Sequence, residues 1–354
     1  MTPPRPPRLD PAIFNLPVDK MRAGYYSDKY FVRAREILLA DGHRPRVTMQ
    51  VFGKAHSFLG GVDEAIAILK LCAVDWKDLS VQALYDGDEV EPWETVMLIE
   101  GPYDAFAHLE TLYLGVLARR TRVGTNTRRV VEAAAPKQVM FFPARHDHWL
   151  VQTGDGWAAH IAGAIGVSTD AQASWWGSEG VGTVPHALIA AYGGDTVLAT
   201  KKFAEHIDPA IQVMTLIDYD NDCVKTALEV ADALGPRLYG VRIDTSEMLV
   251  DRSLWNEMGR FRPTGVNPQL VEKVRRALDA KGYQAVKIVV SGGFTVEKIR
   301  EFERLGVPVD NYGVGSSLFQ GRFDFTADVV MNDGKPCAKV GREFKPNPRL
   351  ERVV

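Results

Sequence analysis

The sequence has few cysteines and no large excess of either charge. Its three cysteines, Cys72, Cys223 and Cys337, are scattered through 354 residues and form neither a CxxC pair nor a zinc-ligand spacing. Scattered cysteines are typical of a reducing compartment, where we expect each to be a small buried apolar side chain. The net charge of −3 gives no electrostatic reason to expect nucleic acid or an anionic membrane as a partner.

Long apolar runs are also missing. No stretch is long enough to span a bilayer and no signal peptide opens the sequence, so we expect a cytoplasmic protein without membrane contact. The apolar and charged fractions, 46% and 25%, are those of an ordinary globular protein. The length allows two domains, and the proline-rich residues 1–11 predict a flexible arm.

The pattern of predicted helices and strands changes near residue 137. Residues 1–136 predict a mixed α/β domain, and residues 137–320 predict a region of alternating strands and helices. In the first, we predict helices at Tyr30–Leu39, Asp63–Leu71, Pro102–Arg120 and Asn126–Ala134, and strands at Val47–Phe52 and Glu94–Ile99. In the second, we predict strands at Gln138–Phe142, Gln212–Ile217, Leu238–Ile243, Val286–Val290 and Asn311–Val314, with helices between them at Trp157–Ile165, Asn221–Leu234, Pro268–Lys281 and Val296–Leu305. Alternation of this kind predicts a parallel sheet, which could close into a barrel of fewer than eight strands. Residues 321–354 predict strand and loop that return to the first domain.

The clearest functional signal is a pair of glycine-rich loops, each directly after a predicted strand. Ser291-Gly292-Gly293 follows one strand, and Gly313-Val314-Gly315-Ser316 ends the next. Backbone N–H groups in such loops are open to an oxyanion, and parallel α/β folds bind ligands at the carboxyl ends of their strands. The two loops therefore predict a phosphate site in an α/β barrel.

Charged side chains follow other predicted strands. Asp218 and Asp244 could hold Mg²⁺, which prefers hard oxygen ligands. Arg145 and Arg242 could each bind a carboxylate or phosphate through two hydrogen bonds. His186 comes just before a predicted helix, where an anion or a phosphorylated imidazole is favoured.

Simpler interpretations of these residues stay open. The acidic residues could cap helices or turns, the arginines could form structural ion pairs, and the histidines could pack internally or lie at the surface. These alternatives apply to Asp218, Asp222, Asp244, Arg145, Arg242, His146, His148 and His186.

Motifs in order along nearly the whole chain resemble those of the nicotinate phosphoribosyltransferase family, within the type II phosphoribosyltransferases. They are YYSDKYF (25–31), GTVPHALI (182–189), GVRIDT (240–245), VSGGF (290–294), YGVGSSL (312–318) and AKVGR (338–342). None would suffice alone, but the set is specific. The resemblance implies an N-terminal α/β sandwich domain packed on an incomplete α/β (TIM-like) barrel.

The resemblance also implies a reaction in NAD biosynthesis. Nicotinate and phosphoribosyl pyrophosphate would give nicotinate mononucleotide and pyrophosphate, with Mg²⁺ and ATP taking part. The histidine of the family's GTxxH motif, His186 here, would be phosphorylated from ATP, which drives synthesis forward. Arg242, Asp218 and Asp244 would complete the catalytic group, and the two aspartates would hold Mg²⁺.

Substrate contacts are implied in the same way. The two glycine loops would hold the ribose phosphate, and the residues expected to contact substrate are Tyr25, Tyr26, Phe142, Arg145, His146, Thr183 and Thr245. Because the family forms head-to-tail dimers, Tyr25 or Tyr26 would reach the site of the partner subunit in a homodimer or larger assembly. The sequence departs from the family in two places. Where many members have two adjacent arginines, this chain has Ala144-Arg145-His146, so His146 or His148 could replace the missing arginine. The cysteine-rich metal-binding tail of some members is represented here by Cys337 alone, so no structural zinc is expected.

Three other functions are compatible with part of this pattern. A decarboxylating quinolinate phosphoribosyltransferase would need a more cationic pocket and no phosphorylatable histidine. A nicotinamide-using enzyme would not need an arginine for a substrate carboxylate. A non-catalytic sensor of phosphoribosyl groups or nucleotides would bind phosphoribosyl pyrophosphate without turnover.

Overall fold

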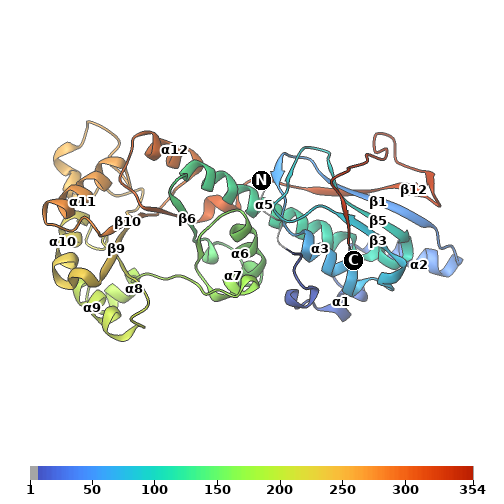
Figure 1. Ribbon diagram of the computed structural model, residues 1–354, viewed down its shortest axis with the longest axis horizontal. Coiled ribbons are helices and arrows are strands. Elements are labelled where there is room, and N and C mark those ends of the chain that lie inside the picture. Colours follow the sequence, from blue (N-terminus) through green and yellow to red (C-terminus); the bar gives the residue numbers. More distant parts are fainter. Residues whose placement is uncertain (1–6, 354) are drawn as a thin grey trace. The chain divides into compact units, whose positions relative to one another are not determined.

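The computed structural model describes residues 7–353, which form two compact units. The first unit runs to Thr125 and includes Trp157–Ala162 and the chain from Phe319 onward, and the second comprises Asn126–Gly156 and Gly163–Leu318 (Figure 1). Among the described residues, no helix is both long enough and apolar enough to cross a membrane.

The first unit is built on an antiparallel sheet of six strands in the order β13-β12-β1-β5-β3-β14. Its strands are β1 (Arg46–Gly53), β3 (Ser80–Ala83), β5 (Thr95–Pro102), β12 (Phe325–Asn332), β13 (Lys335–Pro336) and β14 (Glu351–Arg352), and a separate pair joins β2 (Ser57–Phe58) to β4 (Glu89–Val90). The last part of the chain thus supplies strands at both edges of the sheet, since β12 pairs with β1 and β14 with β3. Helix α3 (Val62–Cys72) is buried on nearly every face and shares one core with these strands.

The other helical elements of the first unit are short, apart from α2 and α5. They are η1 (Pro11–Phe14), α1 (Val18–Arg22), α2 (Lys29–Asp41), η2 (Trp76–Asp78), α4 (Tyr103–Phe106), η3 (Ala107–Leu109) and α5 (Glu110–Ala134), which continues into the second unit. The flexible arm predicted for residues 1–11 is wrong for the part that the structure describes. Asp63 accepts hydrogen bonds from the Arg8 guanidinium and from the Leu9 backbone, each at 2.9 Å; residues 1–6 lie outside the described residues.

Helix α5 corrects the prediction of two helices at Pro102–Arg120 and Asn126–Ala134, because it runs unbroken from Glu110 to Ala134. Four of the five residues between the predicted helices, Thr121, Val123, Gly124 and Thr125, have low helix propensity. They are held instead by buried contacts: the Thr121 hydroxyl bonds to Gly60 and the Thr125 hydroxyl to Phe58. A Cβ built on Gly124 would lie 3.3 Å from the Phe58 ring, so the glycine permits this close packing.

The second unit is an incomplete α/β barrel, as the sequence predicted. Its six strands pair in parallel in the order β7-β6-β11-β10-β9-β8. They are β6 (Gln138–Phe141), β7 (Gly166–Val167), β8 (Val213–Leu216), β9 (Leu238–Ile243), β10 (Lys287–Val290) and β11 (Asn311–Val314). The segment 181–184 touches both edge strands, since Val181 donates its N–H to Val167 and Val184 donates its N–H to Met214. The sheet is therefore curled far enough for one short segment to reach from one edge to the other.

The helices of the second unit follow the strands, and Figure 1 shows α10 and α11 beside β9 and β10. The α-helices are α6 (Gln152–Ile161), α7 (Asp170–Ala173), α8 (His186–Ala191), α9 (Thr196–His206), α10 (Cys223–Leu234), α11 (Pro268–Ala280) and α12 (Val296–Arg304). The 3-10 helices are η4 (Ala144–His146), η5 (Trp149–Val151), η6 (Ser174–Trp176), η7 (Gly235–Arg237), η8 (Arg252–Glu257) and η9 (Ser316–Phe319). The sequence analysis missed β7, which has only two residues, and α9.

Candidate active site

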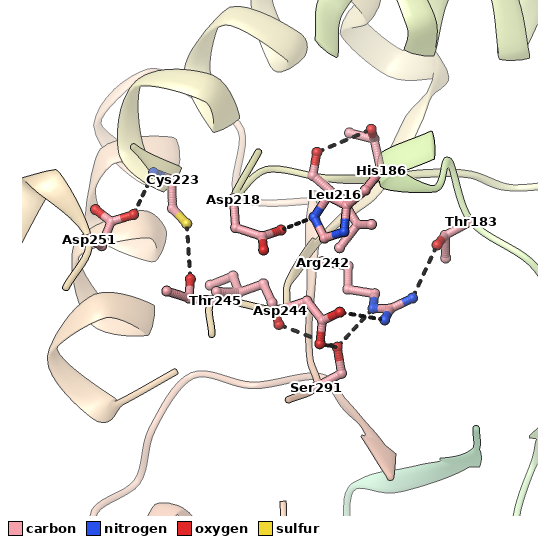
Figure 2. Close-up of polar contacts among 12 residues, drawn as sticks. Thr183, His186, Leu216, Asp218, Cys223, Arg242, Asp244, Thr245, Asp251 and Ser291 are labelled. Atoms are coloured by element: carbon pink, nitrogen blue, oxygen red, sulfur yellow. Dashed lines mark hydrogen bonds and ion pairs between the residues drawn. The ribbon is translucent and has the colours of Figure 1, made fainter. Parts of the chain in front are cut away.

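The candidate site lies at the carboxyl ends of three neighbouring strands of the barrel sheet. Asp218 follows β8, Asp244 follows β9 and Ser291 follows β10. Figure 2 shows these side chains together with His186 and Arg242. The common edge of a parallel sheet thus gathers residues that are far apart in the sequence.

His186 and Asp218 form the first contact of the site. The Nε2 atom of His186 lies 3.1 Å from Oδ1 of Asp218, and the two side chains are 42% and 7% exposed. The hydrogen bond to Asp218 raises the pKa of the imidazole; burial and the Arg242 guanidinium oppose this, and the Asp244 carboxylate supports it. The site therefore favours a histidine that carries its Nε2 proton toward the carboxylate.

Arg242 is the centre of the second contact group. Its Nε donates to the Ser291 hydroxyl at 2.8 Å, one terminal nitrogen lies 3.1 Å from Asp244 Oδ2, and the other lies 3.4 Å from the Thr183 hydroxyl. Ser291 donates in turn to Asp244 Oδ1 at 2.7 Å. The guanidinium also lies 5.2 Å from the centre of the Phe142 ring. One arginine thus links β9 to β10 and to the segment that leads to His186.

The two glycine loops are close to these side chains. Gly292 and Gly293 have φ values of +83° and +69°, which favour glycine, and a Cβ on Gly292 would lie 3.2 Å from Asp244 Oδ1. A Cβ on Gly313 would be 2.4 Å from the Phe142 ring, and one on Gly315 would be 2.9 Å from His146. The structure therefore brings Phe142 and His146 to the second loop, where larger residues would not fit.

Two charged residues beside the first loop were missed by the sequence analysis. The Nζ of Lys298 donates to the Gly292 carbonyl at 3.3 Å, and the Glu247 carboxylate lies against Gly293. Neither residue belongs to a recognisable motif. The only signals in the sequence are that Lys298 occupies the first turn of the helix after the loop and that Glu247 closely follows Asp244.

Several predicted residues lie apart from these contacts or have another partner. Arg145 is exposed in η4, and Ser316 is exposed at the start of η9. Thr245 is buried, with its hydroxyl 3.7 Å from the Cys223 sulfur. Tyr25 and Tyr26 belong to the first unit, where they are 70% and 44% exposed and pack edge to face.

The structure also separates two neighbouring aspartates after β8. Asp222, not Asp218, caps α10, because its side chain accepts a hydrogen bond from the Lys225 N–H. Asp218 is left to face His186. The capping alternative therefore applies to Asp222, whereas the ion pair of Arg242 with Asp244 is compatible with both a structural and a substrate-binding role.

Comparisons with known proteins match both units of the chain. The sequence profile of the quinolinate phosphoribosyl transferase N-terminal domain matches residues 28–121. A nicotinate-nucleotide pyrophosphorylase from Pyrococcus furiosus is 34% identical, and the superposition covers 95% of this chain and 84% of that one with a TM-score of 0.80. Nicotinate phosphoribosyltransferase pncB1 from Mycobacterium tuberculosis is 26% identical over 92% of this chain and 76% of its own length. The chain belongs to the nicotinate phosphoribosyltransferase family, within the type II phosphoribosyltransferases.

A more distant member of this family has the same fold. Human nicotinic acid phosphoribosyltransferase is 18% identical in sequence and superposes over 90% of this chain and 77% of its own with a TM-score of 0.67. The combination of an antiparallel-sheet unit with a curled parallel half-barrel is therefore the fold expected for the family.

The family's expected Mg²⁺ can be compared with the donors present. Within residues 7–353, no group of three or more His, Cys, Asp and Glu side chains is placed to hold a metal ion. Asp218 and Asp244 are both half-buried at neighbouring strand ends. Because Mg²⁺ usually takes one or two carboxylates together with substrate phosphates, these two residues fit an ion that arrives with a diphosphate better than an all-protein site.

Proposed function

We propose that this protein is a nicotinate phosphoribosyltransferase whose reaction is coupled to ATP through His186. The observation that carries the proposal is the His186–Asp218 pair beside the Arg242–Asp244–Ser291 group, at the end of the barrel strands that also carries the glycine loops. This arrangement combines a histidine oriented by a carboxylate with oxyanion donors. The relatives from Mycobacterium tuberculosis and Bacillus subtilis that are named nicotinate phosphoribosyltransferase support the choice of substrate.

His186 would act as the acceptor of a phosphoryl group. If Nε2 carries the proton shared with Asp218, the lone pair of neutral imidazole is at Nδ1. Nδ1 would attack the γ-phosphorus of ATP, forming a P–N bond while the bond to the ADP oxygen breaks. Water would later cleave the P–N bond to release phosphate. Asp218 would fix the tautomer and balance the charge on the ring.

The transfer itself would depend on positioning more than on acid–base chemistry. The bond from the anomeric carbon to pyrophosphate would break as the pyridine nitrogen of nicotinate bonds to that carbon, through a state with oxocarbenium character. The pyridine nitrogen is a free base near neutral pH, so no strong general base is needed. The glycine loops would hold the ribose phosphate and Arg145 the nicotinate carboxylate, so that the reacting atoms meet in line. Mg²⁺ held by Asp218 or Asp244 would supply positive charge for the departing pyrophosphate.

Release of pyrophosphate from phosphoribosyl pyrophosphate tests the proposal. The assay contains Mg²⁺ and one of nicotinate, quinolinate or nicotinamide, each with and without ATP. We expect turnover with nicotinate, stimulated by ATP and accompanied by ADP formation. Absence of nicotinate turnover would rule out the proposed substrate, and turnover indifferent to ATP would rule out the coupling.

Quinolinate is the second candidate substrate, because the matching domain profile over residues 28–121 is that of quinolinate phosphoribosyl transferase. Turnover of quinolinate with release of carbon dioxide and no effect of ATP would assign the protein to that reaction. Arg145 and His146 would then be assigned to the two carboxylates of quinolinate.

The assembly is part of the same proposal. A homodimer in which Tyr25 or Tyr26 enters the site of the partner subunit would explain why both tyrosines are exposed in the isolated chain. Mixing a Tyr25→Ala, Tyr26→Ala double variant with a His186→Ala variant tests this. Shared sites would restore part of the activity in mixed dimers, and independent sites would not.

A further inference from the structure

Lys298 lies at the first glycine loop although no motif includes it. Its Nζ donates to the Gly292 carbonyl at 3.3 Å and lies 4.4 Å from the centre of the Phe294 ring. The side chain is half-buried in the first turn of α12, immediately after the loop. These two contacts, with a carbonyl oxygen and an aromatic ring, hold the ammonium group at the loop.

Glu247 is the anion at the same loop. A Cβ built on Gly293 would lie 1.9 Å from Oε1 of Glu247, so only a glycine leaves room for this carboxylate. Burial lowers the pKa of Lys298; the Arg262 charge adds to this, and the Glu247 carboxylate, followed by Glu301, opposes it. The carboxylate is exposed, on a turn closed by the Leu249 N–H donating to the Ser246 carbonyl. It is therefore free to leave Gly293.

A phosphate on this loop would meet both charges. Glu247 and a phosphate dianion would repel each other if both stayed beside Gly293, because like charges a few ångströms apart are unfavourable even in water. A lysine ammonium suits either anion, since its three donors have no fixed geometry. The Lys298 ammonium can thus bind the incoming phosphate, whereas the Glu247 carboxylate competes with that phosphate for the loop.

We propose that Lys298 binds the 5-phosphate of phosphoribosyl pyrophosphate and that Glu247 is the anion which this phosphate displaces from the loop. The inference rests on the proposed function and adds two residues to it. Lys298 is a phosphate-binding residue that raises affinity, and Glu247 lowers affinity by occupying the loop when no substrate is present. The exchange is electrostatic and makes or breaks no covalent bond.

Kinetics of three variants test this exchange. We expect Lys298→Met to raise the KM for phosphoribosyl pyrophosphate about tenfold or more, as for the loss of a hydrogen bond to a charged group, with a much smaller change in kcat. Lys298→Arg keeps the charge and should restore most of the affinity. Glu247→Gln should lower the same KM. The matched control is Lys225→Met. Lys225 is the third residue of α10, as Lys298 is of α12, and its backbone N–H donates to the helix-capping residue Asp222 in the same way. Its side chain is exposed beside Glu229 and away from the loop.

Calorimetric binding of ribose 5-phosphate separates this inference from the proposed function. If the wild type binds ribose 5-phosphate and Lys298→Met does not, the role of Lys298 stands even if no pyridine substrate is turned over. Equal binding and equal KM in the wild type and Lys298→Met would overturn it. A KM that stays unchanged or rises in Glu247→Gln would overturn the role of Glu247. If Lys298→Met fails to fold, Lys298→Gln, which removes the charge but keeps a polar side chain, decides the role of Lys298, and Glu247→Gln decides that of Glu247.

Discussion

Two buried residues of the first unit and the histidine of the candidate site in the second unit differ in what displaces their pKa values. In the first unit the largest cause is burial, which lowers the pKa of His108 to about 4 and raises that of Glu110 to about 8. In the second unit the pKa of His186 is raised first by its hydrogen bond to Asp218. Burial is also the largest cause of the raised pKa values of Cys223 and Tyr312 in the second unit, so large displacements occur in both units and in groups other than the predicted catalytic residues.

The difference shows that a displaced pKa alone does not locate a functional site. Asp86 illustrates this, because burial and the nearby Asp63 carboxylate raise its pKa although its contacts are structural: it accepts hydrogen bonds from the Val62 N–H and from the Trp157 indole. The candidate site is marked instead by opposite charges in direct contact near the strand ends, where the His186 side chain remains exposed. Four substitutions would break or sharpen this comparison.

Replacing His186 should have the largest effect. We expect His186→Ala to lose all stimulation by ATP and to keep slow basal turnover, because the acceptor for the phosphoryl group is gone. Thermal stability should change little, since the side chain is 42% exposed. The measurement is the initial rate with and without ATP, with His206→Ala, an exposed histidine in α9, as the control. Stimulation that persists in His186→Ala would remove its role.

Arg145→Ala should have the next largest effect. Loss of a charged hydrogen-bond partner predicts a rise of about 10–100-fold in the KM for nicotinate. The fold should be unaffected because Arg145 is exposed. Steady-state kinetics and a thermal unfolding curve give both readouts. Kinetics identical to those of the wild type would withdraw the assignment.

A substitution in the first unit should alter stability and not catalysis. The pKa of Glu110 is about 8 in the folded protein against 4.5 in a free chain, because of burial and of the neighbouring Asp328 and Asp28. The folded state then holds a proton that the unfolded state has lost, so the free energy of unfolding falls as pH rises from 4.5 to 8. We expect Glu110→Gln to be more stable than the wild type at pH 9, by about 1–3 kcal/mol after allowance for screening.

Urea unfolding at pH 4 and pH 9 measures the Glu110 effect. The greater stability of Glu110→Gln should disappear at pH 4, because there the Glu110 side chain of the wild type is protonated and as neutral as glutamine. Glu36→Gln, an exposed carboxylate on α2, is the control and should show no such dependence. An advantage of equal size at both pH values would show that packing rather than charge is responsible.

Asp218→Asn should shift the pH profile of ATP stimulation, in addition to the loss of rate expected for a residue of the catalytic group. Because Asp218 raises the pKa of His186, removing its charge should move the acid limb of ATP stimulation to lower pH. The neutral imidazole needed for attack would then persist at lower pH. The measurement is the pH profile of ADP formation. If the acid side of the pH profile is the same in Asp218→Asn as in the wild type, a group other than His186 is responsible for it.

Much of the fold follows from local patterns in the sequence. Strands β9, β10 and β11 and helices α11 and α12 begin and end within a residue or so of the prediction, because period and capping residues are local signals. The glycine loops and Asp244 could be placed at strand ends for the same reason.

Other features depend on contacts between distant residues. Helix α5 is continuous because Thr121 and Thr125 bond to a segment about sixty residues earlier, which no local propensity reveals. Strand β7 is only two residues long and exists through its pairing with β6. Both cases show tertiary packing overriding a weak local preference.

For the site, the sequence by itself determined which chemical groups stand at or near the strand ends, namely Arg242, Asp244 and the glycine loops, and that His186 stands at a helix start. Motifs and element boundaries depend on neighbouring residues, so they can be recognised in the sequence. Only the tertiary structure decided which groups meet. Asp218 and Asp222 both lie in the short segment between β8 and α10, yet Asp218 faces His186 and Asp222 caps α10. Glu247 and Lys298 are distant in the chain, yet both reach one glycine loop. The physical reason is that hydrogen bonds and ion pairs act over a few ångströms in space, and curling of the parallel sheet sets those distances.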